Sequence, residues 1–197
     1  GMCTKGVPGL DDLTPAELDI TPIEFSEDRS RAKVILFDVY GRGHAKFHQE
    51  VWAPVQNGKV VPELDGRKVS RLSVVQRYAD GKRHVVNGLF HGVHVDRGAV
   101  ATFWPAPTPY FVVVGQESDE MCYCLKEVDK YSGACVVSEN RTKKAVMPLE
   151  IHGVMANMTV DELTSSAAVI DSALEELGNR NEGEPVVNKL LSLFISL

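Results

Sequence analysis

The stretch Val69-Ser-Arg-Leu-Ser-Val-Val-Gln-Arg-Tyr78, followed by Lys82-Arg-His-Val-Val-Asn-Gly-Leu-Phe90, decides the fold class. Asp80-Gly81 between them is a hairpin signal. Apolar and polar residues largely alternate along the first run, as in a sheet with one face toward water. The sequence therefore predicts two adjacent antiparallel strands in a strand-rich domain.

Similar runs extend outward in both directions. Further strands are predicted at Val34–Tyr40, Ala45–Val55, Gly98–Trp104, Tyr110–Gly115, Met121–Val128, Gly133–Ser138 and Ala145–His152. Asn57-Gly58 predicts a tight hairpin, and its flanking prolines place that hairpin at a sheet edge. Roughly eight to ten strands with closely spaced turns indicate an antiparallel barrel, a sandwich or a strongly bent sheet.

The pattern becomes helical near the C-terminus. Thr159-Val-Asp-Glu162 is a capping box, and apolar residues then recur at helical spacing as far as Gly178, which marks a stop. Pro185 begins a second segment, over 185–197, that is apolar almost all round. The predicted class is therefore α+β, a strand-rich sheet followed by two C-terminal helices over 159–178 and 185–197.

The domain organisation follows from length. A single domain of 197 residues buries roughly 70% of the surface that its unfolded chain exposes, so it can fold without a metal or a disulfide. Residues 1–31 are predicted to form an N-terminal tail with a short helix at Thr14-Pro15-Ala16-Glu17. Residues 32–197 are predicted to form one β-rich domain that includes both C-terminal helices.

The charge narrows the classes of partner. A net charge of −6 disfavours broad binding to nucleic acid or to anionic membranes, both of which select positive surfaces. No apolar run approaches the roughly 20 residues that span a bilayer, and no signal peptide follows Met2. If Met2 is the native start, the expected compartment is the cytoplasm.

One segment contains the residues best suited to bind a metal. In the stretch His91-Gly-Val-His94-Val-Asp96, a regular strand places His94 and Asp96 on one face, and a bulge at Gly92 would add His91. Two imidazoles and a carboxylate can hold iron or zinc. A distant His152 could complete the same set with His94 and Asp96. The candidate metal ligands are thus His91, His94, Asp96 and His152, and the candidate cofactor is a divalent metal; hydrogen-bonded polar residues at a strand end are the alternative.

Two segments favour binding to a partner instead. Phe103, Trp104, Tyr110 and Phe111 surround three prolines and would form an aromatic partner surface if exposed. If buried, they are core residues at a strand crossover. In the last helix, Leu190 and Phe194 belong to an apolar surface that packs either into its own fold or against another chain.

The function predicted from these observations is a non-enzymatic binding or interaction module. It would use the aromatic-proline segment and the apolar C-terminal helix to bind a protein partner or a second copy of itself, but neither nucleic acid nor a membrane. Two alternatives stay open. One is a small-ligand carrier with a β-barrel pocket, and the other is a metal-dependent enzyme with the His/Asp site. No nucleophile elbow or glycine-rich phosphate loop occurs in the sequence.

Overall fold

The computed structural model describes residues 10–40, 45–77, 82–104, 110–131, 133–151 and 156–180, together with Val186 and Leu190. The elements in chain order are the 3₁₀ helix η1 (Pro15–Leu18), β1 (Glu24–Phe25), β2 (Arg31–Tyr40), β3 (Ala45–Gln56), β4 (Lys59–Val60), β5 (Glu63–Leu64), β6 (Arg67–Lys68), β7 (Ser70–Arg77), β8 (Arg83–His91), β9 (Ala99–Trp104), β10 (Tyr110–Gly115), α1 (Ser118–Asp129), β11 (Ala134–Glu139), β12 (Thr142–Pro148) and α2 (Val160–Glu176). No helix of this described part is long and apolar enough to cross a membrane.

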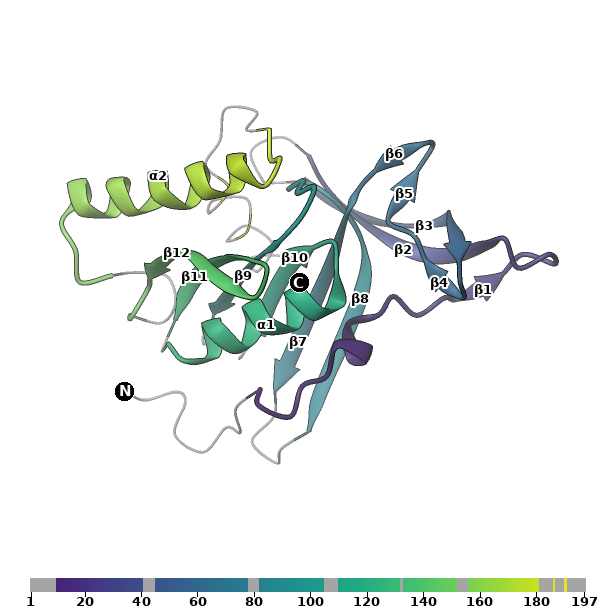
Figure 1. The fold of residues 1–197 in the computed structure, drawn as a ribbon, viewed down its shortest axis with the longest axis horizontal. Coiled ribbons are helices and arrows are strands. Elements are labelled where there is room, and N and C mark those ends of the chain that lie inside the picture. The colour runs from purple at the N-terminus through teal and green to yellow at the C-terminus, as the bar shows by residue number, and fades with distance from the viewer. Residues whose placement is uncertain are drawn as a thin grey trace.

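Ten of the described strands form one mixed sheet in the order β12-β11-β9-β10-β7-β8-β2-β3-β4, with β1 beside β2, and β5 and β6 form a separate two-stranded sheet. Every pair is antiparallel except β2 with β8, which is parallel. The path of paired strands starts at β12 and ends at β4, so the described strands form an open sheet and not a closed barrel. The sheet is strongly bent, and β2 and β3 run away from the direction of β7 and β10 (Figure 1). The prediction of a strand-rich α+β domain with a bent sheet is confirmed.

The two-residue alternation of the central strands places apolar side chains on both faces of the sheet. In β10, Val112 and Val114 belong to the cluster under α2, whereas Phe111 and Val113 belong to the cluster under α1. This part of the sheet is therefore a middle layer between two helices (Figure 1). Burial on both faces explains why β10 reads as a continuous apolar run.

Helix α1 replaces a strand that was predicted over Met121–Val128, and this prediction is wrong. Met121, Cys124, Leu125 and Val128 follow helical spacing and are fully buried against the sheet. A short apolar run fits the period of a strand as well as that of a helix, so periodicity alone does not decide between the two. In the helix the two thiols face different partners: Cys122 Sγ donates to the carbonyl of Leu13 and Cys124 Sγ to that of Val136.

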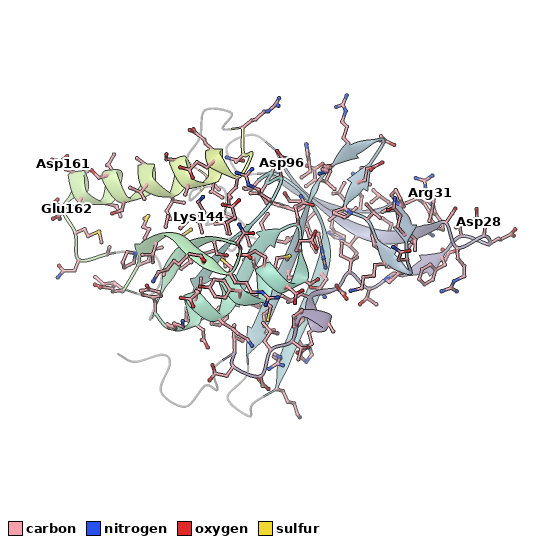
Figure 2. All side chains as sticks on the ribbon, viewed as in Figure 1. Asp28, Arg31, Asp96, Lys144, Asp161 and Glu162 are labelled. Atoms are coloured by element: carbon pink, nitrogen blue, oxygen red, sulfur yellow. The ribbon has the colours of Figure 1, made fainter. Side chains whose placement is uncertain are left out.

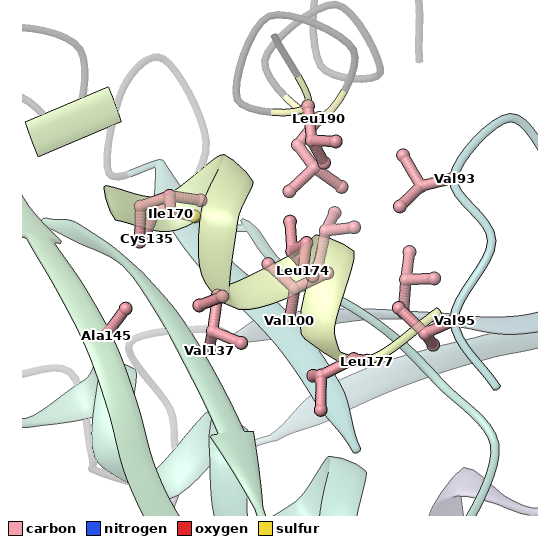
Figure 3. Close-up of a cluster of buried hydrophobic side chains, with 14 of the residues drawn as sticks. Val93, Val95, Val100, Cys135, Val137, Ala145, Ile170, Leu174, Leu177 and Leu190 are labelled. Carbon is pink, nitrogen blue, oxygen red and sulfur yellow. The ribbon is translucent and has the colours of Figure 1, made fainter. Parts of the chain in front are cut away.

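Helix α2 covers the opposite face and agrees with the predicted helix over 159–178. Its capping box at Thr159 and Glu162 is formed, and the chain leaves the helix at Gly178 with a φ of +96°. Ile170 and Leu174 pack on strands β9 and β11, and Leu190 joins the same cluster (Figure 3). Of the second predicted helix, over 185–197, only Val186 and Leu190 are described; both are helical and buried.

Residues 10–20, here called the N-terminal arm, pack against the α1 face of the sheet. Leu10, Leu13 and Leu18 are almost completely buried in the cluster that also contains Phe103 and Phe111. A third apolar cluster lies where the sheet bends toward β2 and β3, and it includes Val34, Leu36 and Leu89. The arm therefore contributes to the core of the domain.

Candidate functional site

Charged side chains gather at one end of the sheet because four strands finish there. Strands β8, β10 and β11 run in the same direction, since each is separated from the next by one antiparallel neighbour. Strand β2 is parallel to β8, so its C-terminal end lies at this end too. The ends of parallel strands are common places for ligand sites, because the loops that follow them converge.

An open pocket with a volume of about 530 Å³ lies at this end, here called the sheet-end pocket. It is lined by Asp96, Arg97, Gly98, Gln116, Glu117, Asp119, Glu120, Glu139, Asn140 and Arg141. The lining residues come from the β8–β9 loop, the start of α1 and the β11–β12 turn. Five carboxylates and two guanidinium groups make the pocket polar and predominantly acidic.

The loop that carries Asp96 is fixed by close backbone packing against the end of α2. The Asp96 amide donates to the carbonyl of Leu177 over 2.8 Å. Gly98 has a φ of +72°, and a Cβ there would lie 2.6 Å from the carbonyl oxygen of Ser138. A Cβ at Gly178 would lie 2.2 Å from Asp96 Oδ2. Both glycines are therefore needed to bring this wall of the pocket into place.

The opposite wall is a strained two-residue turn supported by a buried carboxylate. Asn140 and Arg141 connect β11 to β12 with φ values of +53° and +54°, the geometry of a type I′ hairpin. Arginine is unusual in that conformation. Glu120 accepts hydrogen bonds from the Arg141 amide at 2.8 Å and from Ser138 Oγ at 2.6 Å. This carboxylate thereby ties the first turn of α1 to the hairpin.

An ion-pair network links the pocket to α2. Glu139 accepts hydrogen bonds from Lys144 at 2.9 Å and from Arg97. Lys144 also pairs with Glu176 at 3.0 Å, and Arg97 donates to the Glu176 carbonyl. Figure 2 shows Asp96 at the C-terminal end of α2 and Lys144 beneath that helix. The hydrogen bonds from Lys144 and Arg97 lower the pKa of Glu139 below its ordinary value of 4.5.

Substitution Glu139→Gln should reduce stability at neutral pH and weaken its dependence on acid. Because the folded pKa of Glu139 is depressed, its contribution is present above the ordinary value of 4.5 and is lost as the pH falls through the lower folded value. Urea unfolding of the wild type and the variant from about pH 7 to pH 3 measures this directly. The gap between their free energies of unfolding should shrink with acid; a constant gap would show that the ion pairs contribute nothing.

Two histidine–carboxylate pairs lie at or just beyond the C-terminal ends of β2 and β8. Asp38 is buried on the same face of β2 as Val34 and Leu36. Its Oδ1 atom lies 2.9 Å from His91 Nδ1. The parallel register of β2 and β8 sets Asp38 beside His91. His94 Nε2 lies 3.0 Å from Asp96 Oδ1, which lowers the pKa of Asp96.

The described histidines and carboxylates are not arranged as a metal site. His91 pairs with Asp38 and His94 with Asp96, and no group of three or more His, Cys, Asp or Glu side chains in the described ranges could hold a metal ion. His152 lies outside these ranges. The described members of the predicted set are thus paired with one carboxylate each, and the four-ligand set of His91, His94, Asp96 and His152 stays a prediction.

Two of the four aromatic residues of the predicted partner surface lie in the core. Phe103 and Phe111 are buried and stack with ring centroids 4.0 Å apart, because cross-strand register makes them partners between β9 and β10. Their rings therefore do not form the exposed surface considered from sequence. Tyr110 is half-buried, and Trp104 belongs to β9 with its side chain outside the described residues. Leu190 is buried within the fold and Phe194 lies outside the described residues.

Several residues of the pocket were not singled out from sequence. Glu139 and Arg97 look like ordinary surface charges in a strand-rich sequence, and Glu120 was interpreted, with Glu117 and Asp119, as a solvated carboxylate of a loop. The partners of Glu120 and Arg97 lie 18 to 79 residues away. The only local signal was the Asn140-Arg141 pair between two apolar runs. Recognising Ser118–Asp129 as a helix would have placed Asp119 and Glu120 at its first turn.

The fold and the pocket define the class of this chain: an α+β domain with an open mixed sheet, a helix on each face and a charged pocket at one end. Residues 45–196 match the family model described as "Adenine deaminase C-terminal domain". Because the match covers well over half of the chain, the chain belongs to this family.

Individual relatives agree with the family. An adenine deaminase of Desulforamulus reducens is 27% identical over 165 residues, which are 83% of this chain and 28% of the relative. An adenine deaminase of Moorella thermoacetica is 26% identical over 165 residues, covering 84% and 27%. One from Oceanobacillus iheyensis is 33% identical over 103 residues, covering 52% and 17%. The matched part of the chain thus spans 17–28% of the length of these relatives.

The family corrects the function predicted from sequence. A non-enzymatic binding module is wrong, because the family and its relatives carry the name of an enzyme, adenine deaminase. A carrier with a barrel pocket does not fit the open sheet. The enzyme alternative agrees better with the comparisons. The prediction of a non-enzymatic module relied on the lack of catalytic motifs in the sequence. Such motifs need not occur in a C-terminal domain.

Proposed function

We propose that this chain acts as the C-terminal domain of an adenine-deaminating hydrolase. In that reaction water replaces the 6-amino group of adenine, which gives hypoxanthine and ammonia. The observation that carries the proposal is the family match over residues 45–196, which runs from β3 through α2. The match includes every residue that lines the sheet-end pocket.

A segment exchange tests this proposal. The matching C-terminal quarter of the Desulforamulus reducens adenine deaminase is replaced by this chain, and hypoxanthine and ammonia are measured after adding adenine. The chimera should keep activity within about tenfold of the parent, a difference of about 1.4 kcal/mol in the barrier, whereas the parent cut before that segment should lose activity. A truncated parent with full activity, or a folded but inactive chimera, would contradict the proposal.

We further propose that this domain binds the purine in the sheet-end pocket. Its volume lies in the usual range for small-molecule sites. Adenine presents N–H groups as donors and ring nitrogens as acceptors. The exposed carboxylates of Glu117 and Asp119 can accept from the donors, and Arg141 can donate to the ring nitrogens.

Calorimetric titration of adenine into the chain tests this second step. Asp119→Asn should weaken binding about tenfold, in keeping with the loss of a charged hydrogen bond. Asp161→Asn is the matched control, because Asp161 is an exposed carboxylate at the far end of α2 (Figure 2). Adenine that does not bind, or that binds equally to both variants, would remove the pocket from the proposal and leave the segment exchange unaffected.

A further inference from the structure

The N-terminal arm crosses β7 and β8 over polar side chains that separate two apolar clusters. Asn87 Nδ2 donates to the carbonyls of Glu17 at 2.8 Å and Asp19 at 3.1 Å. Arg71 Nη2 donates to the carbonyl of Leu18 at 2.7 Å. Two side chains of the sheet thus satisfy three consecutive carbonyls of the arm. This direct pairing fixes the arm against the sheet at one short segment.

A second set of contacts holds the same segment from the side of α1. The Asp19 carboxylate accepts from Ser118 Oγ at 2.6 Å and pairs with Arg71 Nη2 at 3.4 Å. Arg71 also donates to the Gln116 carbonyl through Nη1. Arg71 is 8% exposed, and its charge is compensated by Asp19 and these carbonyls.

Three buried polar atoms under this segment lack a partner among the described residues. They are Arg71 Nε, Ser73 Oγ and Asn87 Oδ1. Most buried polar atoms in native proteins are hydrogen-bonded, to protein or to ordered water, so a group of three calls for a physical explanation. Their chemistry is complementary, because Nε donates, Oδ1 accepts and the hydroxyl does both.

The sheet register brings these three side chains together. Ser73 and Asn87 are direct cross-strand partners, so their side chains share one face with Cβ atoms roughly 5 Å apart. Arg71 precedes Ser73 by two residues and points to the same face. Arg71 and Asn87 also reach adjacent carbonyls of the arm, at Leu18 and Glu17. Their remaining polar atoms are therefore confined to the space between the arm and Ser73.

We propose that Arg71, Ser73 and Asn87 form an internal water-binding site beneath the N-terminal arm. A buried water typically makes about three hydrogen bonds to groups that would otherwise be unsatisfied. Here it accepts from Arg71 Nε, donates to Asn87 Oδ1 and exchanges a hydrogen bond with Ser73 Oγ. The water joins the sheet to the two side chains that clamp the arm. This inference does not depend on the proposed deaminase function.

Thr102 provides an internal comparison for this site. Its hydroxyl is also buried and has no partner in the described part of the chain, but it lies on the other face of the sheet. Its cross-strand partners there are Val112 and Cys135, which belong to the apolar cluster under α2. A water beside Thr102 would find too few polar groups to bind.

Removing the hydroxyl of Ser73 and removing that of Thr102 should affect the stability of the fold differently. Ser73→Ala should lower the folding equilibrium constant about five- to tenfold, about 1 to 1.4 kcal/mol, because the water and its two other partners lose a hydrogen bond. Thr102→Val keeps the side-chain shape and removes an unsatisfied hydroxyl, so stability should stay equal or rise. Urea unfolding of both variants and the wild type measures the difference.

A direct observation completes the test. Nuclear Overhauser contacts between the backbone amides around Ser73 and a long-lived water should appear in the wild type and vanish in Ser73→Ala. A Ser73→Ala variant as stable as the wild type or more stable would overturn the site, since that is the response of an unsatisfied hydroxyl. The absence of a long-lived water in the wild type would overturn it as well, whatever the stability of the variant.

Discussion

Replacement of Phe111 by Ala should lower the free energy of unfolding by about 3–5 kcal/mol, the usual cost of truncating a buried aromatic residue. Phe111 is fully buried in the central strand β10, and its ring stacks on Phe103 at a 15° interplanar angle. Apolar side chains from α1 and the N-terminal arm complete the same cluster. The substitution would leave a cavity between sheet and helix that this packed layer cannot readily close.

Urea unfolding of Phe111→Ala measures this cost, with Val86→Ala as the control. Val86 lies in the adjacent part of the same sheet but is 47% exposed, so its truncation should change stability by less than about 0.5 kcal/mol. A Phe111→Ala variant with wild-type stability would mean that the ring is not part of the core. In that case the exposed aromatic surface would have to be reconsidered.

The parts of the fold that local chemistry controls could be predicted from the sequence. Asn57-Gly58 forms the expected two-residue turn, with φ values of +51° and +76° that both residues tolerate. The capping box at Thr159 and the stop at Gly178 delimit α2 for equally local reasons. Helix α1 was missed because its apolar residues also fit a short strand, and only packing on both faces of the sheet decides between the two.

The candidate site was harder to predict from the sequence, because it depends on contacts between distant segments. His94 and Asp96 were selected from their spacing, and they do pair with each other. The buried partner of His91 is Asp38, which comes from a strand 53 residues earlier and is placed by the parallel pairing of β2 with β8. A single parallel pair in an otherwise antiparallel sheet has no local signature. The sequence therefore indicated residues of the site but not which of them meet.

Removal of residues 1–20 should abolish folding or leave a chain that exposes part of its core. The truncation takes Leu10, Leu13 and Leu18 out of the cluster under α1. Each buried leucine lost from a core costs about 2–5 kcal/mol, and three together approach the whole stability of about 5–15 kcal/mol that is typical of a domain. Arg71 and Asn87 would also lose the carbonyls that they now bind.

A graded version keeps this prediction testable if the truncated chain cannot be purified. Leu18→Ala alone should cost about 2–5 kcal/mol in urea unfolding, whereas Ala16→Ser, an exposed position in the same short helix, should cost less than about 0.5 kcal/mol. The family match begins only at residue 45, so the arm lies outside it. A truncated chain that folds with wild-type stability would show that the matched region is sufficient. A large loss would show that the core extends at least 25 residues before that region, because Leu18 belongs to it.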